Sequence, residues 1–228
     1  MKSILFYGDG NTWGYDTAAK GRRFPLETRF TGILMKRFPQ FHIVEEGLPY
    51  RTTAYDIFLQ PDRNGLKSFP MILASASPLD LIVLMLGTND CRTSSITMAQ
   101  ESAAALEQYI RLIRSPEHQH GAQVPEILLI APPPIHPRVL NTQESFYYSA
   151  HSFSRSEDLS IHYSALASRE KCYYLDAAEF VEVGLDGIHL DAKNHEKLAS
   201  AIADKLLQIF PECRRGGIIP HLKRSAGS

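Results

Sequence analysis

The sequence has few cysteines and no long apolar run, and both absences exclude classes of protein. Its three cysteines, Cys91, Cys172 and Cys213, lie far apart, which argues against a disulfide framework and favours a reducing compartment. No apolar run approaches the roughly 18 residues that a membrane-spanning helix needs. The first residues lead directly into an apolar strand pattern, so we expect no signal peptide and a cytoplasmic protein.

The sequence also lacks an excess of charge of either sign. Its formal net charge is -1, so no strong field favours nucleic acid or an anionic membrane as a partner. The nine histidines are scattered, without the close Cys/His spacings of a metal site, and we expect neither a metal nor another cofactor. The composition, 44% hydrophobic and 21% charged, is that of an ordinary globular protein, and we expect one domain over residues 1–228 with a mobile tail from about 216.

Segments with strand and helix patterns alternate along the chain. Five short apolar runs are predicted to be strands: 4–7, 41–44, 79–86, 126–131 and 172–175. Helical spacing of apolar residues predicts five helical segments: 22–38, 65–76, 96–114, 142–170 and 192–209. The run at 79–86 is interrupted only by Asp80, as in a strand buried on both faces of a parallel sheet. The alternation predicts an α/β fold with a three-layer, doubly wound, five-stranded parallel sheet of flavodoxin-like order 2-1-3-4-5.

Polar motifs follow the ends of several predicted strands. They are Gly8-Asp9-Gly10, then Gly47, then Gly87-Thr88-Asn89-Asp90 and, beyond the last strand, Asp186-Gly187-Ile188-His189. The ligand crevice of a doubly wound sheet lies outside the carboxyl ends of its strands, so we expect these motifs to converge.

The spacing of Asp186 and His189 suits a general base. A short loop lets the carboxylate reach one imidazole nitrogen while the other faces the crevice, which would fix the tautomer and stabilise the imidazolium. Taken singly, the motifs have simpler interpretations. Asp186 could cap a helix beside a surface histidine, and Gly47 and Asn89 could be ordinary turn residues.

In this order the motifs resemble the conserved blocks of the SGNH (GDSL-type) hydrolases, a family of serine esterases. The similar segments are Gly8 to Gly14 for block I, Gly47 for block II, Gly87 to Asp90 for block III and Asp186 to His189 for block V. The resemblance spans roughly residues 3–208 and is closest to the arylesterase and acyltransferase branch, on segments such as Glu-Glu-Gly-Leu-Pro-Tyr-Arg-Thr-Thr and Tyr-Ser-Ala-Leu-Ala.

The resemblance implies a function and a set of site residues. It implies the SGNH-hydrolase fold and a carboxylester hydrolase or acyltransferase that acts on small, acetyl-like esters by a Ser-His-Asp mechanism. His189 would be the base and Asp186 would orient it, while the backbone N–H groups of Gly10 and Gly47 and the Asn89 amide would bind the oxyanion. We further expect Asp9, Asn11 and Trp13 to contribute to the substrate site, although Asp9 would also hold its turn and Trp13 could equally belong to the core. A homo-oligomer is compatible with the sequence.

The one departure from the family falls at Gly10, where the nucleophilic serine is expected. Three interpretations compete. The first is an engineered replacement of serine by glycine, which disarms an esterase whose other motifs are intact. The second is a natural non-catalytic homologue that binds an ester or glycan in the same pocket. The third is a changed mechanism, in which His189 activates water directly or Cys91 serves as the nucleophile.

Overall fold

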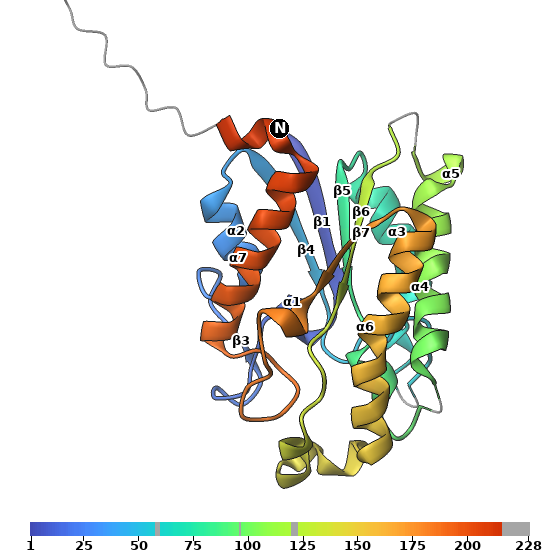
Figure 1. Ribbon diagram of the computed structural model, residues 1–228, viewed down its shortest axis with the longest axis vertical. Coiled ribbons are helices and arrows are strands. Elements are labelled where there is room, and N and C mark those ends of the chain that lie inside the picture. Colours follow the sequence, from blue (N-terminus) through green and yellow to red (C-terminus); the bar gives the residue numbers. More distant parts are fainter. Residues whose placement is uncertain (58–59, 96, 120–122, 216–228) are drawn as a thin grey trace, which may run out of the picture.

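A five-stranded parallel sheet is the centre of the molecule (Figure 1), and the computed structural model describes residues 1–57, 60–95, 97–119 and 123–215. The strands are β1 (Lys2–Gly8), β4 (Phe41–Gly47), β5 (Leu81–Met85), β6 (Glu126–Ala131) and β7 (Tyr173–Asp176). Their spatial order is β4-β1-β5-β6-β7, which confirms the predicted order and fold class. The tail predicted to be mobile lies outside the described residues.

Helices cover both faces of this sheet and complete three layers (Figure 1). One face is covered by α2 (Phe30–Arg37) and α7 (Ala192–Ile209), and the other by α3 (Gly65–Ala76), α4 (Ala99–Arg114) and α6 (Ala150–Glu170). The remaining short elements are α1 (Gly10–Trp13), α5 (Pro116–Gln119), the paired strands β2 (Tyr15–Asp16) and β3 (Arg22–Arg23), and six 3-10 turns, η1 (Pro61–Arg63), η2 (Thr88–Cys91), η3 (Pro137–Asn141), η4 (Gln143–Tyr147), η5 (Ala177–Glu179) and η6 (Pro211–Arg215).

The alternation of β1 side chains explains why both faces of the sheet are buried. Ile4 and Phe6 belong to the core under α2 and α7, whereas Leu5 and Tyr7 belong to the core under α3, α4 and α6. Successive side chains of a strand point to opposite faces, so a strand between two helical layers must be apolar at every position. The continuous apolar runs of the sequence therefore predict the middle of the sheet correctly.

The predicted helix over 22–38 is wrong in its first half, where β3 and a turn precede the shorter helix α2. The reason is a contact distant in sequence. The Arg29 guanidinium donates to the Phe24 carbonyl at 2.8 Å and forms two hydrogen bonds, of 2.9 and 2.8 Å, with the Glu45 carboxylate on β4. These bonds fold the segment before α2 against the sheet, although its apolar spacing alone is helical.

The other predicted segments are confirmed, several of them with shifted ends. The expected helix over 142–170 divides into the turn η4 and α6, because Tyr148 and Ser149 are extended between them. The expected helix over 96–114 begins at Ala99, and residue 96 itself lies outside the described residues. The segments over 65–76, 126–131 and 192–209 have the predicted limits.

Candidate active site

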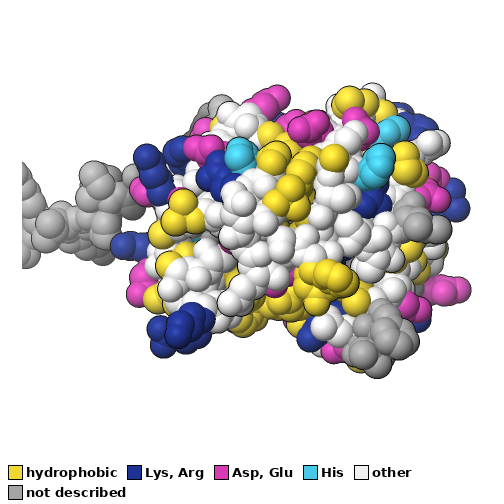
Figure 2. All heavy atoms as spheres, turned by 90° about the horizontal axis from the view of Figure 1, so that it is seen from below, with side chains coloured by type: hydrophobic (Ala, Val, Ile, Leu, Met, Phe, Trp, Pro, Cys, Tyr) yellow, Lys and Arg dark blue, Asp and Glu magenta, His cyan; other side chains and the backbone are white. Residues whose placement is uncertain are grey.

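The predicted motifs meet at the carboxyl ends of the strands, which lie at the lower end of Figure 1. Gly8, the last residue of β1, pairs in register with Gly47 of β4 and Met85 of β5. Figure 2 looks onto this end and shows mostly uncharged atoms across it, with Lys, Arg, Asp and Glu side chains mainly at its rim. The structure therefore brings the ends of three strands together on one largely neutral surface.

Gly10 and His189 face each other directly. Gly10 is the first residue of α1, and a Cβ atom built on it would lie 2.8 Å from Nε2 of His189. The φ angle of Gly10 is not in the positive range, so the backbone at this position does not require glycine. A side chain at position 10 would point at the imidazole, and the ring would have to move slightly to admit it.

Asp186 holds the opposite edge of the same imidazole. Its Oδ2 lies 2.6 Å from Nδ1 of His189, while its Oδ1 accepts the backbone N–H groups of Ile188 at 3.0 Å and His189 at 2.9 Å. Burial raises the pKa of Asp186, but the hydrogen bonds from His189 and Ile188 and the charge of the imidazole outweigh it, so the net pKa lies below the usual range. The carboxylate is thus ionised and aligned to keep the proton of the ring on Nδ1.

Asn11 is buried under the backbone that carries His189, and its side chain is not accessible to a substrate. Its Oδ1 accepts the N–H of Leu190 at 2.8 Å, and its Nδ2 donates to the carbonyl of Ile188 at 3.4 Å. Asn11 therefore clamps the residues on either side of His189, and it is only 2% exposed. The prediction that it contacts substrate is not favoured by this position.

Asp9 is likewise buried rather than open to a substrate. Its Oδ1 caps α1 by accepting the N–H of Asn11 at 3.0 Å, which agrees with the expected turn-holding role. Its Oδ2 is buried without a hydrogen-bond partner among the described residues. Burial raises the pKa of Asp9 above its usual value. The hydrogen bond from Asn11 and the charge of His189 lower it, but burial has the larger effect. Substrate contact by Asp9 is not favoured either.

Gly47 and Asn89, the other two expected oxyanion donors, are joined through Arg51. A Cβ on Gly47 would collide with the backbone of Trp13, so glycine is needed there for α1 to approach β4. The Asn89 Nδ2 donates to the Arg51 carbonyl at 3.1 Å, and the Arg51 Nη1 donates to the carbonyl of Gly8 at 2.9 Å and to that of Glu46. One buried arginine thereby ties together the ends of β1 and β4 and the amide of Asn89.

Aromatic side chains form the wall beside the histidine. Tyr15 stacks on the His189 ring, with ring centroids 4.3 Å apart and an interplanar angle of 22°. Tyr15 also neighbours Tyr50, whose pKa is raised by burial first and then by Glu144 and Tyr15. The half-buried Trp13 lies behind Tyr15, with ring centroids 6.3 Å apart. The role of Trp13 as part of the pocket wall stays a prediction.

Three of these neighbours were missed by the sequence analysis. Tyr15 follows block I directly, and Tyr50 and Arg51 lie in the segment that resembles the arylesterase branch, but no spacing rule gave them a role. Tyr50 has a φ of 66°, in the left-handed region that a bulky residue rarely adopts. This backbone conformation cannot be read from the amino-acid type.

Cys91 is not placed to replace the missing nucleophile. Its side chain is 2% exposed and its Sγ donates to the Gly87 carbonyl at 3.4 Å. Burial and the neighbouring Asp90 raise the pKa of the Cys91 thiol far above its usual value, so the reactive thiolate is disfavoured. Burial likewise raises the pKa of Asp90 to about 6, although hydrogen bonds from Thr53 and Ser102 oppose the shift. Both residues support the loop that carries Asn89.

A second histidine, His195, is fully buried six residues after the candidate base. It stacks on Phe30 at 5.8 Å, its Nδ1 accepts the N–H of the same residue at 3.4 Å, and its Nε2 has no partner among the described residues. Burial lowers the pKa of His195 to about 4 from a usual value of 6.5. This imidazole is neutral in the folded protein and structural in role.

The free energy of unfolding is expected to fall on acidification because of His195. A depressed pKa means that the unfolded chain binds the proton more tightly, so the stabilisation is complete above pH 6.5 and is lost as the pH falls through about 4. The difference between the two pKa values corresponds to a loss of at most about 3 kcal/mol in the free energy of unfolding. Urea unfolding at pH 7 and pH 4 should show a smaller loss for His195→Leu than for the unchanged chain. The exposed His42→Leu is the control, and an equal loss in all three chains would contradict the assignment.

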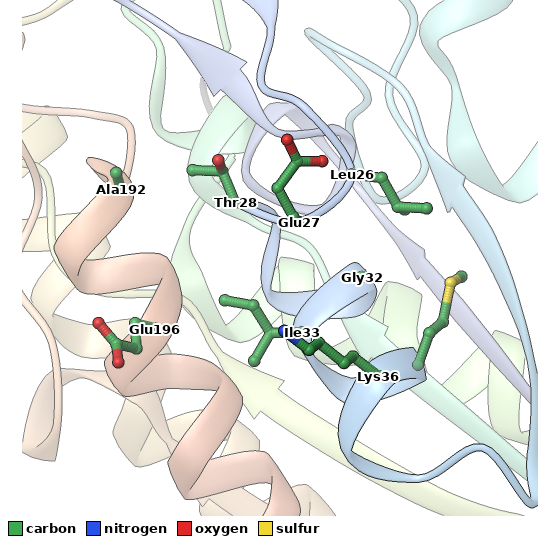
Figure 3. Close-up of a pocket in the computed structure, with 9 residues that line it drawn as sticks. Leu26, Glu27, Thr28, Gly32, Ile33, Lys36, Ala192 and Glu196 are labelled. Carbon is green, nitrogen blue, oxygen red and sulfur yellow. The ribbon is translucent and has the colours of Figure 1, made fainter.

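The hollow between α2 and α7 is not part of this site (Figure 3). Its lining includes Ile33 and Lys36 from α2 and Glu196 from α7, but none of the predicted site residues.

Among the described residues, no three His, Cys, Asp or Glu side chains are arranged to hold a metal ion. No helix within the described part of the chain is long and apolar enough to cross a bilayer. The Asp186–His189 pair lies among backbone and amide N–H donors, including those of Gly10 and Asn89, outside this hollow.

Comparisons with known proteins agree with this geometry. The sequence profile of the GDSL-like Lipase/Acylhydrolase family matches residues 6–197. The chain is similar to Est24, a carbohydrate acetylesterase from Sinorhizobium meliloti, at 34% identity and a TM-score of 0.85, covering 92% of this chain and 100% of that one. It is similar to the aryl esterase of M. smegmatis at 31% identity and a TM-score of 0.86, with the same coverage. A comparison with curated proteins found no match.

A more distant structure supports the fold alone. The lipase/acylhydrolase from Enterococcus faecalis is 17% identical, with a TM-score of 0.65 over 90% of this chain and 95% of that one. At this identity the shared arrangement of strands and helices carries no information about substrate.

Proposed function

Because the chain belongs to the GDSL-like lipase/acylhydrolase family, we propose that its site is built for the hydrolysis or transfer of small acyl groups from carboxylic esters, and that glycine at position 10 disarms it. The observation that carries the proposal is the alignment of Asp186, His189 and position 10. The carboxylate lies 2.6 Å from Nδ1, and Nε2 lies 2.8 Å from where a Cβ at position 10 would stand.

The alignment gives each group a role in acyl transfer. With a hydroxyl at position 10, the Nε2 of His189 would take its proton as the oxygen attacks the ester carbonyl, and would return the proton to the leaving alcohol. Asp186 would stabilise the imidazolium formed in between. The N–H groups of Gly10 and Gly47 and the second N–H of the Asn89 amide would stabilise the oxyanion, because one Asn89 N–H is already bonded to Arg51.

Small acyl esters are favoured by the crowding around His189. Tyr15 covers one face of the His189 ring and α1 approaches its edge, so these contacts limit the directions from which an acyl group can reach Nε2. The structures to which this chain is similar include an aryl esterase and a carbohydrate acetylesterase, both of which act on esters. The alternative is a natural binding protein that holds an ester or glycan without cleaving it, and only the glycine itself favours this alternative. Hydrolysis of p-nitrophenyl acetate by the unchanged chain and by Gly10→Ser separates the two.

A further inference from the structure

A carboxylate is buried directly beside one of the expected oxyanion donors. Asp90 follows Asn89 in the turn η2, and its side chain is fully buried. Burying a charged group is unfavourable unless hydrogen bonds replace the water that it loses. The donors around Asp90 therefore indicate which parts of the site this carboxylate joins.

Three donors from two other parts of the chain meet the Asp90 carboxylate. Its Oδ1 accepts the backbone N–H of Thr53 at 2.9 Å, and its Oδ2 accepts the hydroxyl of the same residue at 2.6 Å. The Oδ2 also accepts the hydroxyl of Ser102, on α4, at 2.7 Å. Thr53 is itself fully buried, and its carbonyl accepts the N–H of Leu66 at 2.9 Å and the hydroxyl of Tyr109 at 2.5 Å. Asp90 thus fastens η2 to a residue whose every polar atom is bonded.

The segment that Asp90 holds is also bound by its neighbour Asn89. The Asn89 Nδ2 donates to the carbonyl of Arg51, two residues before Thr53. Successive residues of η2 are therefore bound to one short segment, the first through its amide and the second through its carboxylate. This segment follows β4, which ends at Gly47, another expected oxyanion donor. The bonds of Asp90 thus lie between two of the three groups that would bind the oxyanion.

We propose that Asp90 is a positioning residue, whose ionised carboxylate holds the Asn89 amide at the place where the oxyanion forms. When the carboxyl group carries a proton, one oxygen becomes a donor, and the hydroxyls of Thr53 and Ser102 have fewer acceptor sites. A buried donor without an acceptor is unfavourable, so η2 is expected to shift relative to Thr53. The part of Asn89 in catalysis rests on the proposed function, whereas the dependence of its position on Asp90 does not.

The ionisation of Asp90 falls in an accessible range of pH. Burial raises the pKa of Asp90 to about 6, although hydrogen bonds from Thr53 and Ser102 oppose the shift, and the charge of Asp9 adds to it. The ionisable groups that face this carboxyl are those of Asp9, Tyr55, Cys91, Tyr109 and Tyr163. Burial raises the pKa of the three tyrosines and of the thiol, so these four stay neutral near pH 6. Asp9 is the member of this set that can titrate together with Asp90.

The position of the amide can be measured in the chain that has glycine at position 10. The probe is the pair of side-chain N–H₂ resonances of Asn89 in ¹⁵N NMR spectra, recorded at several values of pH in a His189→Ala background that removes the imidazole. We expect both resonances to shift with a midpoint near pH 6. Asp90→Asn, which mimics the protonated carboxyl, should abolish this transition. The matched control Asp9→Asn can still cap α1 and should keep the transition, at a lower pH because one neighbouring negative charge is gone.

The effect on the rate is measured in a chain that carries Gly10→Ser. The further change Asp90→Asn should lower kcat for p-nitrophenyl acetate at least about tenfold, with an upper bound of about 10²–10³ from the loss of a whole oxyanion donor. KM should stay nearly unchanged, because the amide stabilises charge that develops only in the transition state. Thr53→Val removes one of the three bonds and should lower kcat in the same way by a smaller factor. It also replaces Asp90→Asn if thermal melting shows that this chain does not fold.

The proposal is overturned if the Asn89 resonances show no transition near pH 6, or if the transition persists in Asp90→Asn. It is equally overturned if kcat of an active Gly10→Ser chain is unchanged by a folded Asp90→Asn variant, or by Thr53→Val in its place. Its failure is distinguishable from that of the esterase function. An inactive Gly10→Ser chain whose Asn89 amide follows the ionisation of Asp90 refutes the esterase alone. An active one whose amide and kcat are independent of Asp90 refutes the role of Asp90 alone.

Discussion

Replacing Gly10 with serine is expected to raise the hydrolysis of p-nitrophenyl acetate at least about a thousandfold, with an upper bound on the order of 10⁶ taken from removal of the serine of subtilisin. The hydroxyl is the only missing part of an otherwise aligned set. Position 10 has no positive φ, so its backbone accepts a side chain, and that side chain would point at Nε2 of His189. The gain should stay below the upper bound because the imidazole must first move away from the new Cβ.

The matched control for this gain is Gly10→Ala. Alanine displaces the imidazole as serine does but brings no nucleophile, so its rate should stay at that of the unchanged chain. A double variant, Gly10→Ser with His189→Ala, keeps the hydroxyl and removes the base, and it measures any contaminating esterase. A folded Gly10→Ser chain that is no faster than these two controls across several short-chain esters would show that the chain is not a disarmed esterase. Its site would then be one that binds esters without cleaving them.

The parts of the fold that the sequence predicts are those set by local patterns. β1 is apolar at every position from Ile4 to Tyr7 because both faces of the sheet are covered, and Gly8 marks its end. Likewise the three-residue spacing of Asp186 and His189 is enough to place the carboxylate against the ring in one short loop. Each of these features depends on residues that are close in sequence.

The features that escaped prediction depend on partners far along the chain. Arg29 shortens α2 through Glu45, sixteen residues away. Asn11, expected at the substrate, bonds to the backbone of Ile188 and Leu190 instead, 177 and 179 residues away. Arg51 has no motif of its own and takes its role from the three carbonyl and amide groups around it. Such contacts are products of the finished fold, and residue type alone does not indicate them.

In a chain that carries Gly10→Ser, the further change Asp186→Asn is expected to lower kcat for p-nitrophenyl acetate by about 10⁴, as the equivalent change does in other triads. An asparagine can still accept the N–H groups of Ile188 and His189 through its oxygen, so the loop should keep its shape. Its amide would then present N–H donors to Nδ1 of His189, where Oδ2 of the aspartate now lies 2.6 Å away. The ring would carry its proton on Nε2, and Nε2 could no longer accept the proton of the serine.

The tautomer can be followed without any catalysis in the chain that has glycine at position 10. The ¹⁵N shifts of the His189 ring should report a proton on Nδ1 in the unchanged chain and on Nε2 after Asp186→Asn. Asp191→Asn is the matched control, since Asp191 caps α7 by accepting the N–H of Asn194 at 2.8 Å and asparagine caps equally well. It should alter neither the tautomer nor the rate. An Asp186→Asn chain with an unchanged tautomer and full kcat would mean that the 2.6 Å contact does not orient the base, and His189 would then act alone.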